Sequence, residues 1–474
     1  MYRKKAHLHF VGIGGIGMSG IATILKYQGY RISGCDIDVE QKSIQELRSI
    51  GCIIHEGHNT EYCNDSSIDV LVYSSAVKAS SPEIIAAQDR GTPTIPRALM
   101  LAELMRTKYS VAIAGSHGKT TTTSMISHIL IEAHTDPTVI IGGHLKNIST
   151  HARLGSGDFL VAESDESDRS FLYLHATLAI VTNIDLEHLE TYRDLDDVKD
   201  TFKQFLSNLP FYGKAIVCVD DPNVRSILPL PHIKTIKYGL DDQAEYADIF
   251  ASHIQLYADY SSFIVNHKTE KTVLGPVTVS MPGRHNILNA LAAITLALEL
   301  GITFEIAAAA LQTFKGVDRR FSYKGLFNGA EIFDDYGHHP QEIFNTLQVA
   351  RKRTKNKLTV IFQPHRYSRT HKLWDQFVDM FTSCPIDNLI ITDIYPASEA
   401  PIPGVTAEKL VQAIQQKNPS FSVKYAPYDS SFDAIQQELN GCIADQDLIL
   451  LQGAGKINKL ADSLAKSNDQ EAPL

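Results

Sequence analysis

A glycine-rich segment with a lysine and two threonines follows an apolar stretch and has the residue types needed to bind phosphate. Gly115–Thr121 reads GSHGKTT and comes directly after the apolar residues 111–114. In such a loop, backbone N–H groups surround phosphate oxygens, the lysine reaches the β and γ oxygens, and the threonine hydroxyl binds Mg²⁺. Ile113 stands where the general pattern has its first glycine, so the loop is a variant. The pattern predicts ATP binding by Gly115, Ser116, His117, Gly118, Lys119, Thr120 and Thr121, with a chance match as the alternative.

A second glycine-rich turn lies near the N-terminus. Gly12, Gly14, Gly15 and Gly17 match GxGxxG, and Asp36 lies at the end of the next expected strand. Glycines in this pattern let a pyrophosphate approach the start of a helix. The pattern alone leaves three alternatives open: a dinucleotide, another diphosphate nucleotide, or a turn with only a structural role.

Two further residues follow apolar strands and could hold a metal ion beside the phosphates. Glu163 ends one strand and His188 follows the next, so with Thr120 they form a candidate Mg²⁺ site. For His188 a surface or hydrogen-bonding role is the alternative. We interpret Asp165, Glu166 and Asp168 as a solvated acidic turn.

Three more clusters lie at expected strand ends or helix starts. Asn286 and Asn289 are spaced to cap a helix or to read an adenine edge. Residues 334–340, DDYGHHP, are rich in titratable groups. Residues 363–369, QPHRYSR, supply two guanidinium groups that can grip carboxylate or phosphate.

Composition limits the class of protein. The 474 residues carry a formal charge of −10, which disfavours a nucleic-acid binder. The six cysteines form no CxxC pair and are interpreted as buried thiols in a reducing compartment. Apolar stretches are short or interrupted by glycine, so we expect no membrane insertion and a cytoplasmic protein.

Strands and helices are expected to alternate, which predicts parallel sheets with right-handed crossovers. The expected strands are 7–11, 31–35, 70–73, 110–114, 159–162, 178–182, 358–362, 389–392 and 448–451. The expected helices are 18–28, 43–50, 83–90, 198–209, 290–300, 306–314 and one that begins at Lys119. The polar tail from Ser467 is expected to be loose.

The chain is expected to be an α/β protein of three domains. Their boundaries are 1–107 for an N-terminal Rossmann-like domain, 108–316 for a central P-loop ATPase-type domain, and 317–474 for a C-terminal Rossmann-like domain.

These motifs together resemble the Mur ligase family, the ATP-dependent amide-forming enzymes of bacterial peptidoglycan synthesis. The resemblance extends from Gly12 to about Ala465 and includes GSHGKTT and the HNxxN segment 285–289. GIGGIGMSGIA at 12–22, SSAV at 74–77, DDYGHHP at 334–340 and YPASEAPIPGV at 395–405 indicate the alanine-adding type. Glu187 stands where the family usually has aspartate.

The resemblance implies an activity, substrates and site residues. The activity is ATP-dependent joining of L-alanine to the lactyl carboxylate of UDP-N-acetylmuramate through an acyl phosphate, with Mg²⁺ required and a monomer or homodimer as the assembly. It assigns the sugar nucleotide to Gly12, Gly14, Gly15, Gly17, Asp36, Ser74 and Ser75. It adds Asn286, Asn289, Arg320 and Asp335 to the ATP site, and it makes His338, His365, Arg366 and Arg369 candidates for binding the amino acid. The expected catalytic residues are Lys119, His188, His338, Arg366 and Arg369.

Three other functions stay open as alternatives. A ligase of the same family that recycles whole tripeptides is the nearest. A nicotinamide-dependent dehydrogenase accounts for GxGxxG but leaves the lysine loop unexplained. A non-catalytic nucleotide-binding regulator is disfavoured because Lys119, Thr120, Glu163 and His188 are all present.

Overall fold

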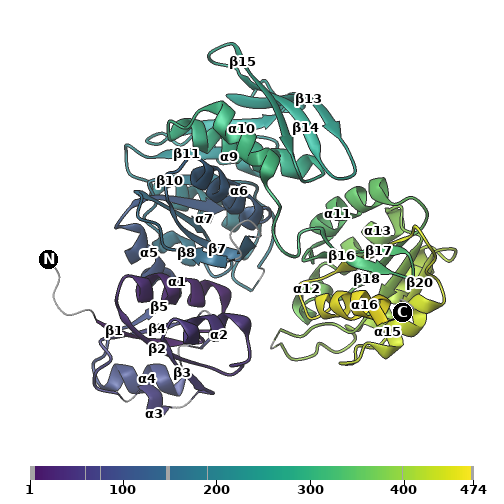
Figure 1. The fold of residues 1–474 in the computed structure, drawn as a ribbon, viewed down its shortest axis with the longest axis horizontal. Helices are drawn as coiled ribbons and strands as arrows, with labels where there is room; N and C mark the ends of the chain where they lie inside the picture. The colour runs from purple at the N-terminus through teal and green to yellow at the C-terminus, as the bar shows by residue number, and fades with distance from the viewer. Residues whose placement is uncertain are drawn as a thin grey trace. The chain divides into compact units, whose positions relative to one another are not determined.

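The structure, a computed structural model, describes residues 6–58, 60–63, 65–74, 76–78, 80–145, 150–188, 190–397 and 399–470. It is an α/β protein built on three sheets (Figure 1). The chain divides into two compact units, which are described separately. Unit 1 comprises 1–255, 262–280 and 284–315, and unit 2 comprises 256–261, 281–283 and 316–474.

The first sheet of unit 1 is parallel, with strand order β3-β2-β1-β4-β5. Val11 pairs with Cys35 on one side and with Tyr73 on the other, so three strands end at one edge of the sheet. Its strands are β1 (His7–Val11), β2 (Arg31–Asp36), β3 (Ile53–Glu56), β4 (Val70–Tyr73) and β5 (Thr94–Pro96). Its helices are α1 (Ile16–Tyr27), α2 (Lys42–Ser49), α3 (Thr60–Cys63), α4 (Pro82–Asp89) and α5 (Arg97–Met105).

The second sheet of unit 1 has ten strands in the order β15-β14-β13-β12-β11-β10-β6-β9-β7-β8. Its centre is β6 (Tyr109–Ala114), which pairs in parallel with β9 (Phe159–Glu163) and β10 (Leu178–Val181). The other strands are β7 (Thr138–Leu145), β8 (Thr150–Arg153), β11 (Lys214–Cys218), β12 (Lys234–Leu240), β13 (Ile249–Leu256), β14 (Ser261–His267) and β15 (Thr272–Val279). The helices are α6 (Lys119–Glu132), α7 (Leu195–Ser207), α8 (Pro222–Ser226), α9 (Arg284–Glu299), α10 (Phe304–Thr313) and the 3₁₀ helices η1 (Ser170–Tyr173) and η2 (Asp241–Gln243).

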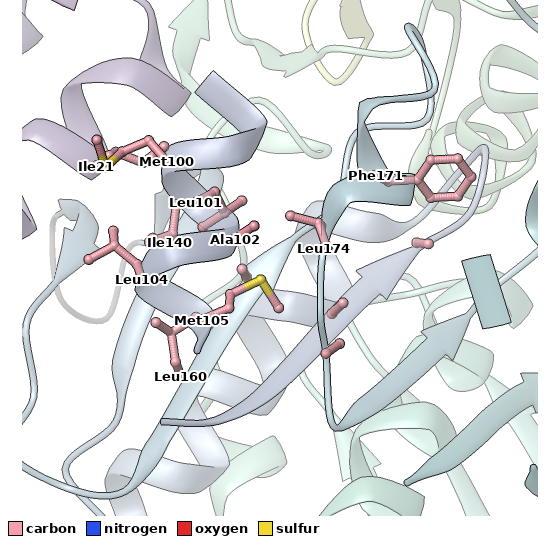
Figure 2. Close-up of a cluster of buried hydrophobic side chains, with 14 of the residues drawn as sticks. Ile21, Met100, Leu101, Ala102, Leu104, Met105, Ile140, Leu160, Phe171 and Leu174 are labelled. Carbon is pink, nitrogen blue, oxygen red and sulfur yellow. The ribbon is translucent and has the colours of Figure 1, made fainter. Parts of the chain in front are cut away.

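Helix α5 joins the two sheets of unit 1 through a shared hydrophobic core. Figure 2 shows its apolar side chains between Ile21 of α1 and the side chains of Ile140, Leu160 and Phe171. Each fully buried Leu or Met side chain contributes about 1.5–3 kcal/mol through burial. The side chains that α5 buries are Ala98, Met100, Leu101, Ala102, Leu104 and Met105. This packing fixes the GxGxxG turn relative to the lysine loop within one unit.

Unit 2 contains a six-stranded sheet with the order β16-β17-β21-β18-β19-β20. All pairs are parallel except β16 with β17. Gln452 pairs with both Asp335 and Phe362, so three strands end at the same edge. The strands are β16 (Ser322–Phe327), β17 (Ala330–Asp335), β18 (Leu358–Phe362), β19 (Asn388–Ile391), β20 (Ser422–Tyr425) and β21 (Leu448–Gln452). The helices are α11 (Pro340–Arg353), α12 (Tyr367–Lys372), α13 (Trp374–Ser383), α14 (Ala407–Lys417), α15 (Asp433–Asn440) and α16 (Asn458–Gln470).

Each element expected from the sequence is present, with ends that differ by a few residues, or by six at the start of α9. Other strands of the described residues were not expected, namely β3, β5, β7, β8, β11–β17 and β20. In β13, β14 and β15 half-exposed residues interrupt the apolar pattern. The expectation of a loose tail is wrong for 467–470, since α16 is anchored by Leu460 and Leu464 and continues to Gln470. Of the helices in the described ranges, none has the length and apolarity that crossing a bilayer requires.

Candidate active site

The lysine loop connects the end of β6 to the start of α6. Gly115 has φ +136° and Gly118 has φ +81°, conformations that favour glycine. A Cβ on Gly115 would lie 2.0 Å from Thr182 Oγ1, and one on Gly118 would lie 2.7 Å from Asn289 Oδ1. Both glycines are therefore needed for the close approach of neighbouring elements, and the loop leads directly into the helix N-terminus, where anions bind favourably.

Lys119 is held inside the loop by three acceptors. Its Nζ donates to the carbonyls of Gly115 at 2.6 Å and Ser116 at 3.1 Å, and to Glu166 Oε1 at 2.8 Å. Burial lowers the pKa of Lys119, but the Glu166 carboxylate outweighs burial and raises the pKa above its usual range. The ammonium is therefore fixed as a cation at the position where the loop would meet phosphate.

The segment that follows β10 supports the outer part of the loop. Thr182 Oγ1 and Asn183 Nδ2 donate to the His117 carbonyl at 2.7 and 3.0 Å. Asn183 Oδ1 accepts from the His117 N–H at 2.8 Å, and the Asp185 N–H donates to Ser116 Oγ at 2.8 Å. The loop is thus ordered by protein contacts alone, which reduces the entropy lost when a ligand binds.

The side chains of Thr120 and Glu163 are in contact, as expected for two ligands of one Mg²⁺ ion. The Thr120 hydroxyl donates to Glu163 Oε1 at 2.9 Å, and the Gly142 N–H donates to Oε2 at 2.8 Å. Glu163 ends β9, the strand beside β6. A hydroxyl and a carboxylate at the first turn of α6 are oxygen donors of the kind that Mg²⁺ prefers.

A second group of possible ligands surrounds His188. Its Nε2 lies 3.5 Å from Glu166 Oε1 and 3.5 Å from Glu187 Oε2. Burial lowers the pKa of His188, but hydrogen bonds to Glu166 and Glu190 outweigh burial and raise the pKa to about 9. Glu166 Oε2 and Glu187 Oε1 are buried and have no hydrogen-bond partner among the described residues. Buried carboxylate oxygens without donors are costly unless a cation satisfies them, so this group fits a metal ion.

The interpretation of Glu166 as part of a solvated turn is wrong. Its side chain is 3% exposed and pairs with Lys119, whereas Asp168 is exposed as expected. Glu187, whose side chain is 9% exposed, also lies at the site and was not predicted as a ligand. The signal that could have identified both is their position just after β9 and β10, where α/β folds bind ligands.

The paired asparagines lie on the buried face of α9. Asn289 Oδ1 accepts from Thr122 Oγ1 at 3.1 Å, and its Nδ2 donates to Asn286 Oδ1 at 3.2 Å. Both side chains are buried. Asn289 therefore braces the first turn of α6, and an adenine contact by either residue stays a prediction.

The GxGxxG turn is held by Asp36, one of the residues predicted to bind the sugar nucleotide. The Gly14 N–H donates to Asp36 Oδ2 at 2.8 Å, and the Asp36 side chain is buried. A Cβ on Gly17 would lie 3.0 Å from Arg97 Nη1, and Arg97 pairs with Asp165 at 3.3 Å. Gly12 has φ +79° and lies against Ser74, whereas Ser75 lies outside the described residues. The turn therefore has a guanidinium at the start of α1 that sequence reasoning missed.

In unit 2 the two aspartates at the end of β17 differ in their hydrogen bonding. Asp335 accepts hydrogen bonds from Gln452 Nε2 at 2.7 Å and from the N–H groups of Gly337 and Phe321. Asp334 is fully buried, and within the described ranges neither of its oxygens accepts a hydrogen bond. Burial raises the pKa of Asp334 to about 6, although Arg319 opposes the shift. The hydrogen bonds of Asp335 hold the loop that follows β17. Binding of ATP by Asp335 stays a prediction.

Histidine and arginine side chains gather where β17 and β18 end. The rings of His338 and His365 lie 5.5 Å apart, and His365 stacks on Tyr395. Arg369 Nη1 lies 3.2 Å from His365 Nδ1. Burial, with Arg369 next, lowers the pKa of His365 to about 3, and burial also holds the pKa of His338 well below its usual range. Both histidines are therefore neutral near pH 7 and can accept hydrogen bonds.

Two further predicted residues lie on the loops of this edge. Arg366 Nη1 is 3.7 Å from Glu399 Oε1 and its side chain is 37% exposed. Arg320 lies over the Tyr336 ring, 5.4 Å from its centre, and 3.8 Å from Glu342. Both guanidinium groups are partly exposed, and their ligands stay predictions.

The chain is similar to known proteins over nearly its whole length. The chain matches the Mur ligase family, catalytic domain, over residues 7–109, the Mur ligase middle domain over 113–297, and the Mur ligase, glutamate ligase domain, over 319–455. It is 47% identical to the UDP-N-acetylmuramate–L-alanine ligase of Geotalea uraniireducens, over 98% of this chain and 99% of that protein. This chain belongs to the Mur ligase family.

A second relative and a solved structure agree with this. The UDP-N-acetylmuramate–L-alanine ligase of Geobacter sp. strain M21 is 48% identical over 98% of both chains. The crystal structure of the UDP-N-acetylmuramate–alanine ligase from Thermotoga maritima is 26% identical, with a TM-score of 0.79, and covers 98% of this chain and 99% of that one. As a Mur ligase, the chain has the three-domain α/β fold expected from its sequence.

Substituting Gly115 by alanine is expected to weaken binding of a non-hydrolysable ATP analogue at least about 10-fold. The added Cβ would collide with Thr182 and displace the loop. Gly91→Ala is the matched control, because Gly91 also has a positive φ, +73°, but open space around it. Calorimetric titration should show the loss in the first variant only, and wild-type affinity in Gly115→Ala would contradict the role of the loop.

Asp334→Asn is expected to stabilise unit 2 more at about pH 7.5 than at about pH 4.5. Because folding raises the pKa of Asp334, protonated Asp334 contributes stability that is fully present below the pKa of the unfolded chain. This contribution is lost as pH rises through about 6. The gain in the free energy of unfolding should be larger at the higher pH by about 2 kcal/mol, given the size of the pKa shift. The single tryptophan, Trp374 in α13, reports the urea unfolding of unit 2 by fluorescence. Exposed Asp433→Asn should show no such increase with pH, and an equal gain at both pH values would contradict the prediction.

Proposed function

We propose that this Mur ligase joins L-alanine to the lactyl carboxylate of UDP-N-acetylmuramate, with ATP converted to ADP and phosphate. The observation that carries the proposal is the Lys119 cation, held between loop carbonyls and buried Glu166 at the start of α6. Such a cation is suited to an ATP γ-phosphate. The choice of sugar nucleotide and amino acid is supported by relatives of that name at 47–48% identity over nearly the whole chain.

The reaction must first activate a carboxylate, which is a poor electrophile. The γ-phosphoryl group of ATP is transferred to a lactyl carboxylate oxygen, which forms an acyl phosphate and releases ADP. The neutral amine of L-alanine then attacks the acyl carbon. The bond between that carbon and the phosphate oxygen breaks, phosphate leaves with the electron pair, and the amine loses a proton. Lys119 and the loop N–H groups stabilise the charge that spreads over the phosphoryl oxygens.

Mg²⁺ would be held by Thr120 and Glu163, and a second ion by His188 with Glu166 and Glu187. The unpartnered oxygens of Glu166 and Glu187 support this assignment. A bound metal ion would neutralise part of the negative charge on the phosphate groups of ATP. Lys119 keeps Glu166 oriented toward His188, and the Gly142 N–H keeps Glu163 oriented toward Thr120.

The remaining residues would bind the other two substrates. The UDP-sugar would be bound by Gly12, Gly14, Gly15, Gly17, Asp36, Ser74 and Ser75, with Arg97 beside the glycine turn. His338, His365, Arg366 and Arg369 bind L-alanine: a guanidinium holds its carboxylate, and neutral His338 orients its amine by accepting a hydrogen bond. Asn286, Asn289, Arg320 and Asp335 complete the ATP site. The domain boundaries we propose are 1–107, 108–316 and 317–474, in a cytoplasmic monomer or homodimer.

Phosphate release with ATP, Mg²⁺ and UDP-N-acetylmuramate tests the proposal when free amino acids are screened one at a time. L-alanine should give the highest kcat/KM, and omission of the sugar nucleotide should abolish release. A tripeptide that begins with L-alanine is the matched competitor. Release with the tripeptide but not with L-alanine would identify the recycling type of ligase instead.

A further inference from the structure

A cysteine, a histidine and a glutamate from three separate elements converge at the carboxyl edge of the first sheet. Cys35 is near the end of β2, His58 follows β3, and Glu83 lies in the first turn of α4. Cys35 Sγ lies 3.6 Å from His58 Nδ1, and the same Nδ1 lies 3.3 Å from Glu83 Oε1. One atom from each residue lies within 4.8 Å of the other two. None of the three belongs to the site described above.

Two of the three spacings between ligand atoms match the edges of a metal coordination tetrahedron. Ligands about 2.0–2.3 Å from a tetrahedral Zn²⁺ lie roughly 3.4 Å apart for nitrogen and oxygen and roughly 3.6 Å apart for nitrogen and sulfur. The two distances from His58 Nδ1, 3.3 Å to Glu83 Oε1 and 3.6 Å to Cys35 Sγ, agree with these values. Thiolate, imidazole and carboxylate together form a borderline-soft donor set, which favours Zn²⁺ over Mg²⁺.

The carboxylate gives an independent reason to expect a cation here. The Glu83 side chain is 1% exposed, and its Oε1 accepts no hydrogen bond from any described residue. Its other oxygen accepts from Ser81 Oγ. A single Nδ1–H of His58 cannot serve both Cys35 Sγ and Glu83 Oε1. A buried carboxylate oxygen that faces an imidazole nitrogen and a sulfur is satisfied if a cation lies between them.

We propose that Cys35, His58 and Glu83 form a Zn²⁺ site. Binding displaces the Cys35 thiol proton to solvent, so that thiolate, neutral imidazole and carboxylate hold the ion. The His58 side chain is 32% exposed, which leaves the fourth position open to water. The site also fixes the end of β2, where Asp36 accepts from the Gly14 N–H.

Cobalt(II), a spectroscopic substitute for Zn²⁺, tests the site in the full-length protein. After metal is removed with a chelator and Mg²⁺ is added in excess, one equivalent of Co²⁺ should produce a thiolate-to-metal charge-transfer band, and Zn²⁺ should abolish it. Cys35→Ser should lose the band. Cys52→Ser, a buried cysteine of the same domain, should keep it.

Zn²⁺ affinity supplies a second readout that does not depend on the thiolate band. His58→Ala should weaken Zn²⁺ binding at least about 10-fold and reduce the rise in Tm that Zn²⁺ causes in the wild type. His58 is partly exposed, so this variant decides the matter if Cys35→Ser does not fold. Absence of the band in the wild type, its survival in Cys35→Ser, or unchanged Zn²⁺ affinity in His58→Ala would overturn the proposal.

Discussion

Turnover of Lys119→Ala should fall about 10³-fold, measured as ADP release with all three substrates saturating. The lysine is the one loop residue whose charged side chain is already fixed between two carbonyls and a carboxylate before substrate binds. Its loss removes a preorganised cation from the transferring phosphoryl group, where such groups have their largest effects. Binding of UDP-N-acetylmuramate should be retained, because the turn that would hold it lies on the other sheet.

Stability must be separated from catalysis in this variant. Removing Lys119 breaks its buried ion pair with Glu166, which typically costs about 3–5 kcal/mol, and leaves His188, 3.5 Å away, beside that carboxylate. The double variant Lys119→Met/Glu166→Gln removes the buried charge as well and should recover much of the lost stability but none of the turnover. Lys42→Ala, at a side chain that is 72% exposed, is the surface control. Turnover near the wild-type level in a folded Lys119→Ala protein would contradict the proposed role.

Glu163→Gln should raise the Mg²⁺ concentration for half-maximal activity at least about 10-fold and lower kcat about 10²-fold. Glutamine keeps the size of the side chain and an acceptor for Thr120 Oγ1, but it removes the negative charge that favours a divalent cation. A Mg²⁺ titration of phosphate release measures both effects.

Glu103→Gln is the control for this experiment, because its side chain is 58% exposed on α5. An unchanged Mg²⁺ dependence in Glu163→Gln would show that Thr120 and Glu163 form only a structural hydrogen bond.

The lysine loop could be predicted from sequence because its signal is local. A strand, a glycine loop and a helix start follow one another, and the glycines occupy the positive φ positions that the loop requires. The partners of the loop could not be predicted in the same way. Glu166 lies in an acidic segment that is typical of a solvated turn, and only the fold brings it to Lys119.

The asparagines of α9 show the same limit. Their spacing predicts one shared face of a helix, which is correct, but spacing cannot say what that face contacts. Asn289 bonds Thr122, 167 residues earlier in the chain. Helix α5 was not predicted from the sequence, and its apolar side chains alone could not indicate that it packs against both sheets of unit 1.

Transfer of oxygen from substrate to phosphate tests the central claim most directly. UDP-N-acetylmuramate labelled with ¹⁸O in its lactyl carboxylate would be turned over with unlabelled ATP and L-alanine, and the released phosphate analysed by mass spectrometry. An acyl phosphate predicts that each phosphate carries one oxygen from the carboxylate. Phosphate free of label, with the amide formed, would contradict activation of the carboxylate by ATP.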